Sequence, residues 1–266
     1  LGDRPLNQIT PAEIQKLYAH LKKRGRVRKH KKYGYQLSDS MVHCIHTLLH
    51  GAMGAAAQLR LIPRNSVADV TAPKQKPPPK QILNDEQLDT FMAAIQADDI
   101  WRDFFYTELT TGLRLGEICG LRWEDFDAEH GVLNIQRTVH VEKGGVLTTG
   151  DTKTYAGTRK IVLPASTVQC LRERKEAALT DWIFSNPLKP ELPVNPRAAY
   201  SRLKALLKDT GLPSIRFHDL RHTFSTHALS SGVDAKTLSG ILGHSRASFT
   251  LDTYTHVTGD MQKRAS

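Results

Sequence analysis

The sequence has no long apolar run and no signal peptide. None of its 266 residues belongs to a hydrophobic stretch near the ~18 to 20 residues that span a bilayer. The start, LGDRPLNQIT, lacks the charged region and apolar stretch of a secretory signal. These absences argue against a membrane-spanning or secreted protein and predict a soluble chain in the cytoplasm. A hydrophobic content of 39% is normal for a globular protein with one large or two ordinary domains.

Cysteine is also scarce. Cys44, Cys119 and Cys170 are widely spaced and form neither a disulfide framework nor a C-x-x-C metal or redox motif. We therefore interpret all three as small buried residues.

The net charge of +10 is concentrated in the first third of the chain. Residues 1–80 contain 15 Lys and Arg against 4 Asp and Glu, whereas residues 81–266 contain 22 against 23. Much of the excess lies in KKRGRVRKHKK at 22–32, and such a segment favours a polyanion as partner, with nucleic acid first. A solvated basic loop that binds nothing is the alternative. The predicted DNA-binding side chains are Lys22, Lys23, Arg24, Arg26, Arg28, Lys29, Lys31 and Lys32.

A proline-rich linker divides the chain. PKQKPPPK at 73–80 cannot continue a helix or a sheet, because proline removes a backbone donor and restricts the residue before it. We predict a small basic helical domain at 1–72, a linker at 73–82 and a second domain at 83–266. In the first domain, Thr10, Pro11 and Glu13 predict a capped helix start, and an apolar stripe predicts another helix at about 38–60.

The second domain is expected to be mainly α with one small sheet, an α+β arrangement. Asn84 predicts the cap of one helix, and helical patterns follow at about 101–111, at 114–122 and from about 165 to the end, with a proline-rich break near 187–196. Between them, the segments 132–141, 145–150 and 159–164 predict a three-stranded antiparallel sheet. The sequence contains no internal repeat.

FHDLRHTF at 217–224 places two histidines around an arginine. His218 and His222 are four residues apart, as in zinc-binding helices, but position 219 is Asp and Arg221 is a permanent cation between them. No cluster of Cys, Asp or further His offers a third ligand, so we expect no metal and no cofactor. Ordinary buried or capping histidines remain the alternative.

Four motifs occur in a fixed order after the linker: TGLRLGEICGLRW (111–123), TKTYAGTRKIVLP (152–164), FHDLRHTFSTHALSSG (217–232) and LSGILGHSRASFTLDTYTHV (238–257). In order and spacing they resemble the tyrosine recombinases, the phage-integrase family, including integrases of mobile elements such as conjugative transposons. The basic helical domain resembles that family's core-binding domain, which is SAM-like. The resemblance implies a catalytic set of Arg114, Lys153, His218, Arg221, His244 and Tyr254, with Glu117 in support. His222 lies on a different face from Arg221, and we predict a packing or supporting role for it.

The chemistry of DNA strand cleavage requires such residues. Negative charge grows on the non-bridging oxygens as phosphorus becomes five-coordinate, so fixed positive donors are needed there. Arginine stays protonated and offers a planar fork for two oxygens, which suits Arg114 and Arg221. A tyrosine hydroxyl is a suitable nucleophile, His218 and His244 can donate hydrogen bonds or accept a proton, and a flexible lysine suits protonation of the leaving 5′ hydroxyl.

The resemblance further implies double-stranded DNA as substrate, a dimer on one site and a tetramer on two, strand exchange through a four-way junction, and accessory DNA-bending or excision factors as possible partners. A type IB topoisomerase and a non-catalytic DNA-binding protein are the alternatives. Leu1 in place of Met suggests that an N-terminal region has been removed, where integrases of mobile elements often carry an arm-site-binding domain.

Overall fold

The computed structural model describes residues 2–74, 81–151 and 157–243 of the 266. Contacts divide the chain into two compact units, Leu1–Pro79 and Lys80–Ser266, and each is described by itself.

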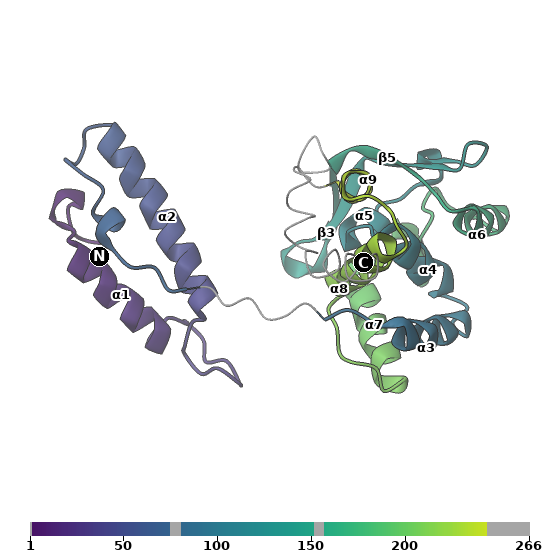
Figure 1. Cartoon of the computed structure of the whole chain (residues 1–266), viewed down its shortest axis with the longest axis horizontal. Coiled ribbons are helices and arrows are strands. Elements are labelled where there is room, and N and C mark those ends of the chain that lie inside the picture. Colours follow the sequence, from purple (N-terminus) through teal and green to yellow (C-terminus); the bar gives the residue numbers. More distant parts are fainter. Residues whose placement is uncertain (1, 75–80, 152–156, 244–266) are drawn as a thin grey trace, which may run out of the picture. The chain divides into compact units, whose positions relative to one another are not determined.

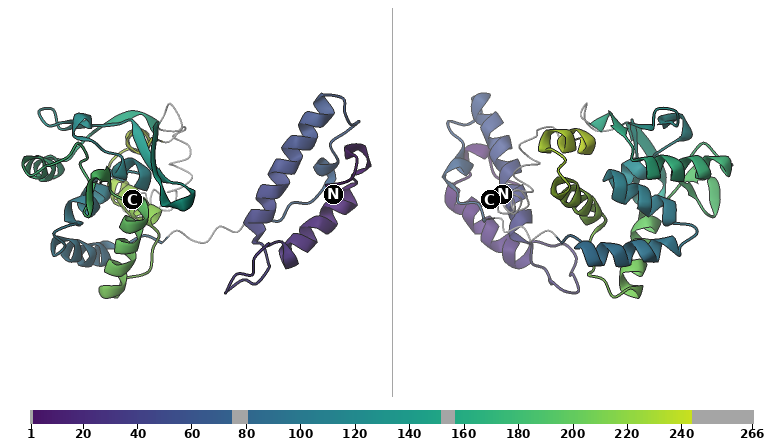
Figure 2. Two further views of the ribbon diagram at one scale, coloured as in Figure 1. Left: turned by 180° about the vertical axis from the view of Figure 1, so that it is seen from behind. Right: turned by 45° about the vertical axis from the view of Figure 1, so that its right-hand side comes forward.

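The first unit is built on two helices, α1 (Pro11–Arg24) and α2 (Asp39–Gln58), which lie side by side (Figures 1 and 2). The predicted capping box is present, since the Thr10 side chain accepts from the Glu13 backbone N–H and Glu13 accepts from the Thr10 N–H. The facing sides of the helices bury Ile14, Tyr18 and Val42, and the Tyr18 hydroxyl lies 3.0 Å from His46 Nδ1. Burial of these apolar side chains, at roughly 2 kcal/mol for each large one, holds the two helices together.

The second unit is mainly helical, as predicted. Its helices are α3 (Asp85–Gln96), α4 (Arg102–Thr111), α5 (Leu115–Cys119), α6 (Ala165–Glu176), α7 (Pro196–Asp209), α8 (Phe217–Ser230) and α9 (Ala235–Leu242). Asn84 and Gln87 form the capping box of α3, in agreement with the predicted cap at Asn84. In Figure 1, α4, α5 and α8 lie between the strands on one side and α3 and α7 on the other.

The three predicted strand segments are present and antiparallel, but they belong to two sheets and not to one. The segment 132–141 forms two strands, β2 (Val132–Ile135) and β3 (Arg137–Val141). Gln136 lies between the two strands, and its side chain donates to Asp125 Oδ1 at 2.8 Å. This hydrogen bond lies at the point where β2 ends and β3 begins. As a result β3 pairs with β4 (Leu147–Asp151), while β2 lies between β1 (Phe126–Asp127) and β5 (Arg159–Val162). The proline-rich break also contains a hairpin, β6 (Ser185–Asn186) and β7 (Lys189–Pro193).

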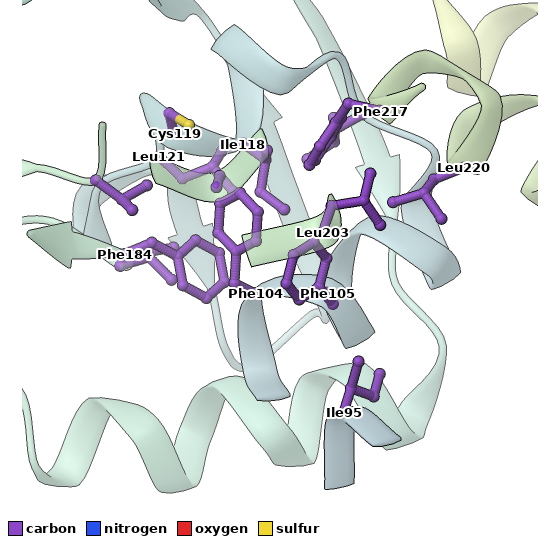
Figure 3. Close-up of a cluster of buried hydrophobic side chains, with 14 of the residues drawn as sticks. Ile95, Phe104, Phe105, Ile118, Cys119, Leu121, Phe184, Leu203, Phe217 and Leu220 are labelled. Atoms are coloured by element: carbon purple, nitrogen blue, oxygen red, sulfur yellow. The ribbon is translucent and has the colours of Figure 1, made fainter. Parts of the chain in front are cut away.

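One apolar core joins most of these elements, while α9 packs on α8 through a separate cluster of Leu229, Leu238 and Leu242. Phe104 and Phe105 of α4 lie at the centre of the core and meet Phe184 and, from the start of α8, Phe217 at ring-centroid distances of 5.2 to 6.3 Å (Figure 3). Ile118 of α5 and Leu203 of α7 complete the same core. Because α4, α5 and α8 share this core, the first residues of α5 and α8 are held in fixed positions relative to each other.

The prediction that all three cysteines are buried is wrong for Cys44, which is exposed on α2. Cys119 is buried and Cys170 is half-buried. Cys44 lies on the side of α2 that faces away from α1, where the helix period places it apart from the buried Val42 and Met53. No helix within residues 2–74, 81–151 and 157–243 is long and apolar enough to cross a membrane.

Candidate active site

Arg114 lies at the start of α5. It is the N-cap residue, and the Glu117 carboxylate accepts both the Arg114 backbone N–H at 3.0 Å and the Arg114 Nη1 at 2.7 Å. The arginine side chain is 41% exposed and that of Glu117 is 4% exposed. The Glu117 carboxylate therefore fixes the Arg114 guanidinium, and part of this guanidinium stays accessible to a ligand.

A second arginine, Arg159 at the start of β5, binds the same carboxylate. Its Nη2 lies 2.9 Å from Glu117 Oε2 and its Nη1 lies 3.2 Å from Oε1. Burial opposes ionisation of Glu117, but the hydrogen bonds and charges of Arg159 and Arg114 outweigh it and hold the pKa of this carboxyl below its ordinary value. Glu117 is thus a buried anion shared by two cations.

Arg221 is held in α8, whose first turn is fixed by Asp219. The Asp219 carboxylate accepts the Arg216 backbone N–H at 2.8 Å, which caps the helix. Arg221, two residues after Asp219, is 2% exposed and donates from Nη1 to the Gly112 carbonyl at 2.8 Å. Gly112 ends α4 with φ of 60°, and a side chain there would collide with the Phe224 ring. Glycine is therefore required where the end of α4 presents its carbonyl to Arg221.

The end of α9 is where the three arginines meet. The last carbonyls of a helix have no partner within the helix. In α9, Arg159 Nε donates to the Ile241 carbonyl at 2.6 Å, Arg221 Nη2 to Leu242 at 2.6 Å and Arg114 Nη2 to Gly243 at 3.2 Å. Gly243 itself has φ of 64° and turns the chain out of the helix. Three consecutive carbonyls, at the negative end of the helix dipole, thus place three guanidinium groups side by side.

His218 lies one turn before Arg221 on α8. Its ring packs edge to face on the ring of His222, with centroids 4.8 Å apart, while the residue remains exposed on its outer side. Desolvation of the packed part and the nearby charge of Arg221 lower the pKa of His218, which favours a neutral ring able to accept a proton. His222 is buried and contacts the His218 ring, and its packing or supporting role stays a prediction.

The site has an excess of positive charge. Burial, and then the charge of Arg114, lower the pKa of Arg221 to about 10, so it is protonated at neutral pH but its charge is incompletely balanced. Glu108 of α4 is fully buried nearby, yet burial raises the pKa of its carboxyl well above the ordinary value and favours the neutral acid. Among the residues that the structure describes, three guanidinium groups therefore face one ionised carboxylate, Glu117. An arriving phosphate would supply the missing negative charge.

Three predicted site residues lie outside the described residues: Lys153, His244 and Tyr254. Lys153 belongs to the segment between β4 and β5, and His244 follows Gly243 in the sequence. In the described residues β4 pairs with β3 and β5 with β2, so the segment with Lys153 connects two sheets. Within the described ranges no group of three or more His, Cys, Asp or Glu side chains is arranged to hold a metal ion.

The predicted DNA-binding residues lie in the first unit, at the end of α1 and in the loop that follows. Lys22, Lys23 and Arg24 form the last turn of α1, and Lys22 Nζ pairs with Asp39 at 2.8 Å. Arg26 is half-buried and donates to the Gln36 carbonyl at 2.7 Å. The other basic side chains are exposed: Arg28, Lys29, Lys31 and Lys32. The guanidinium of Arg24 also lies 5.8 Å from the Tyr35 ring centroid. The structure thus places a cationic surface on this unit.

If this surface binds DNA, salt should weaken binding through counterion release, with a slope of log affinity against log salt of about −0.9 per neutralised phosphate. Replacing Lys22, Lys23, Arg24, Arg26 and Arg28 together by uncharged residues is expected to flatten the slope by about 0.9 for each phosphate that is no longer neutralised. The measurement is DNA binding by fluorescence anisotropy from low to high salt. Neutralising the exposed Lys175, Lys189 and Lys208 of the second unit is the control, and an unchanged slope in the fivefold variant would show that the segment does not contact DNA.

Arg159 and Glu108 are the site residues that the sequence did not indicate. Arg159 lies within the motif 152–164, but an arginine in a strand is ordinarily an exposed charge, and its partners are 42 and 82 residues away. Glu108 occupies a polar position of a helix, where exposure is expected. Neither residue type nor spacing identifies such pairings.

The second unit matches a known protein family. The profile of the phage integrase family matches residues 81–260, which include every residue of the second unit that the structure describes. The chain belongs to the phage integrase family, the tyrosine recombinases.

Two curated relatives carry recombinase or integrase names, and one solved structure shares the fold. A tyrosine recombinase XerC-like protein of Caldanaerobacter subterraneus is 30% identical over 198 residues, which are 66% of this chain and 50% of that protein. The ICEBs1 integrase of Bacillus subtilis is 26% identical over 272 residues, covering 97% of this chain and 70% of the relative. A structure of the Tn1549 transposon integrase with transposon right-end DNA matches 100% of this chain and 89% of its own, with a TM-score of 0.79 and 24% identity. The chain spans about half the length of the first two curated relatives that it matches.

Proposed function

We propose that this protein is a site-specific DNA recombinase that cleaves and rejoins DNA through a 3′-phosphotyrosine intermediate. The observation that carries the proposal is the meeting of Arg114, Arg159 and Arg221 at the end of α9, where Glu117 is the one ionised carboxylate beside them among the described residues. Such an excess of fixed donors is suited to a phosphate whose negative charge increases during reaction. The family assignment supplies the reaction type.

In this mechanism Arg114 and Arg221 clamp the scissile phosphate. Arg114 offers its exposed guanidinium to one non-bridging oxygen, while the buried Arg221 provides charge from beneath. Because both side chains are already fixed by carbonyls and Glu117, little reorganisation is needed when charge develops. His218, with its lowered pKa, accepts a proton or hydrogen-bonds the phosphate.

The remaining chemical roles fall to residues outside the described ranges. Tyr254 attacks phosphorus, so that a bond from its oxygen to phosphorus forms and the bond to the 5′ oxygen breaks. Lys153 gives a proton to that 5′ oxygen, and His244 adds a donor to the phosphate. The phosphotyrosine link retains the energy of the phosphodiester, so rejoining needs no ATP. The arginines supply the charge stabilisation that a metal would otherwise give.

The proposal includes the assembly and location of the reaction. The protein acts on double-stranded DNA as a dimer on one site and a tetramer on two, in the bacterial cytoplasm, in integration or excision of a mobile element. The named relatives include the integrase of ICEBs1 and that of transposon Tn1549. Supercoil relaxation without strand exchange would instead favour a type IB topoisomerase activity, and sequence-specific binding without covalent linkage would favour a DNA-binding protein.

The direct test is covalent capture on a library of nicked duplexes, carried out with Mg²⁺ and with EDTA. A nick beside the cleavage site releases the 5′-hydroxyl strand and so prevents rejoining. We expect protein to remain attached at recurring sequences through the 3′ phosphate, to an equal extent in EDTA, because the charge stabilisers are side chains. Attachment that is lost on chelation and restored by Mg²⁺ or Zn²⁺ would overturn the proposed phosphate clamp, and no attachment in either condition would contradict the cleavage activity.

A further inference from the structure

One side chain connects three separate elements of the site. Arg159 begins β5, binds Glu117 of α5 through both terminal nitrogens, and binds the Ile241 carbonyl of α9 through Nε. Its side chain is only 7% exposed, whereas that of Arg114 is 41% exposed. Arg114 is therefore the member of this pair that can meet DNA, and Arg159 acts inside the protein.

The position of Arg159 determines how strongly Glu117 holds Arg114. The buried carboxylate accepts from Arg114 Nη1 at 2.7 Å and from Arg159 Nη2 at 2.9 Å. While both cations are present, the negative charge is shared between them. Without Arg159, the whole charge would face Arg114 in a site of low polarity, where charge interactions are strong. Arg114 would then be held more tightly by Glu117 and would be less available to a phosphate.

Arg159 also anchors the last turn of α9. Its bond to Ile241 lies beside the bonds of Arg221 to Leu242 and Arg114 to Gly243. Without Arg159, the Ile241 carbonyl would lose one hydrogen bond. The carbonyls at a helix end have few partners, so this loss would weaken the last turn of α9. Arg114 and Arg221, which bind the same helix end, would be less well fixed.

We infer that Arg159 is a positioning residue of the cleavage reaction, which keeps Arg114 available to the phosphate by sharing Glu117 and fixes the end of α9 through Ile241. This inference rests on the proposed recombinase function. It assigns no contact between Arg159 and DNA. Its distinguishing consequence is that removal of the Glu117 charge should partly repair the loss of Arg159.

The experiment compares single-turnover cleavage of a nicked duplex by the wild-type chain, Arg159→Met, Glu117→Gln and the double variant. Arg159→Met is expected to cleave at least about tenfold more slowly with DNA affinity changed less than about threefold, since an uncharged side chain of similar length cannot share Glu117. The double variant is expected to cleave at least about threefold faster than Arg159→Met, because the neutral amide introduced by Glu117→Gln no longer retains Arg114. Arg159→Lys, which keeps the charge but not the fork, should lie between wild type and Arg159→Met.

The matched control is Arg174→Met. Arg174 likewise bonds a carboxylate, Asp103 at 3.1 Å, and a backbone carbonyl, Ile183 at 2.7 Å, but it belongs to α6 and not to the site. Its cleavage rate per folded molecule should equal that of wild type. A wild-type rate in Arg159→Met, or a double variant no faster than Arg159→Met, would overturn the inference. If Arg159→Met does not fold, the cleavage rates of Arg159→Lys with and without Glu117→Gln are compared instead. Failure of the proposed function is separate, since the wild-type chain would then not cleave at all.

Discussion

Replacing Tyr254 by phenylalanine is expected to abolish the covalent protein–DNA adduct while DNA binding persists. The change removes one oxygen and keeps the ring, so the nucleophile is lost but the cationic side chains that bind DNA are not. DNA affinity should change by less than about tenfold, or roughly 1.4 kcal/mol. Adduct formation is measured by denaturing gel on a nicked duplex, and affinity by anisotropy under the same conditions.

Tyr200→Phe provides the control for this prediction. Tyr200 is exposed on α7, and its hydroxyl has no role in the proposed chemistry. This variant should form adduct at the wild-type rate. An adduct that persists in Tyr254→Phe would remove Tyr254 from the mechanism, and loss of DNA binding together with the adduct would show that the change had not isolated the chemical step.

Arg221→Lys is expected to lower the cleavage rate by about 10² or more, the scale observed when one transition-state donor is removed. The Arg221 guanidinium donates to the Gly112 carbonyl at the end of α4 and to the Leu242 carbonyl at the end of α9. Lysine keeps the charge, but its single ammonium group cannot reproduce both hydrogen bonds. Single-turnover cleavage measures the effect. Arg174→Lys makes a similar change outside the site, and its rate should stay at the wild-type value. Circular dichroism melting confirms that each variant is folded, and a wild-type rate in Arg221→Lys would remove Arg221 from the clamp.

A substrate with a sulfur in place of the 5′ bridging oxygen separates the arginine from the lysine. Sulfur leaves without needing a proton, so the deficit of Lys153→Ala should largely disappear on this substrate. The deficit of Arg221→Lys should remain, because the arginine stabilises the non-bridging oxygens. Recovery of Arg221→Lys by the sulfur substrate would mean that the roles of the two residues are exchanged.

Local signals in the sequence account for much of the fold. The capping boxes at Thr10 and Asn84 arise from side chains within three residues of the backbone groups they bind, so the pattern alone predicts α1 and α3. The helical spacing of apolar residues, which is also a local signal, predicts α2 and α4 to within a few residues. For the site, the spacing in FHDLRHTF places His218 and Arg221 on one side of α8, and the structure has them there.

Tertiary pairing explains what the sequence did not indicate. The segments around β2 and β3 are equally rich in β-forming residues, and the break at Gln136 depends on Asp125, eleven residues earlier. Arg159 finds Glu117 only because β5 and α5 meet in the folded unit. The three carbonyls of α9 carry no side-chain signal at all, since every helix end has such groups. These carbonyls become part of the site only because the folded chain brings three arginines to them.

Identifying the residue that is bonded to DNA tests the proposed mechanism most directly. The adduct trapped on a nicked duplex is digested with protease and nuclease, and the peptide that carries the nucleotide is sequenced by mass spectrometry. We expect a 3′-nucleotide linked through phosphate to the oxygen of Tyr254. A nucleotide on any other residue, or one linked through its 5′ end, would contradict the proposed mechanism.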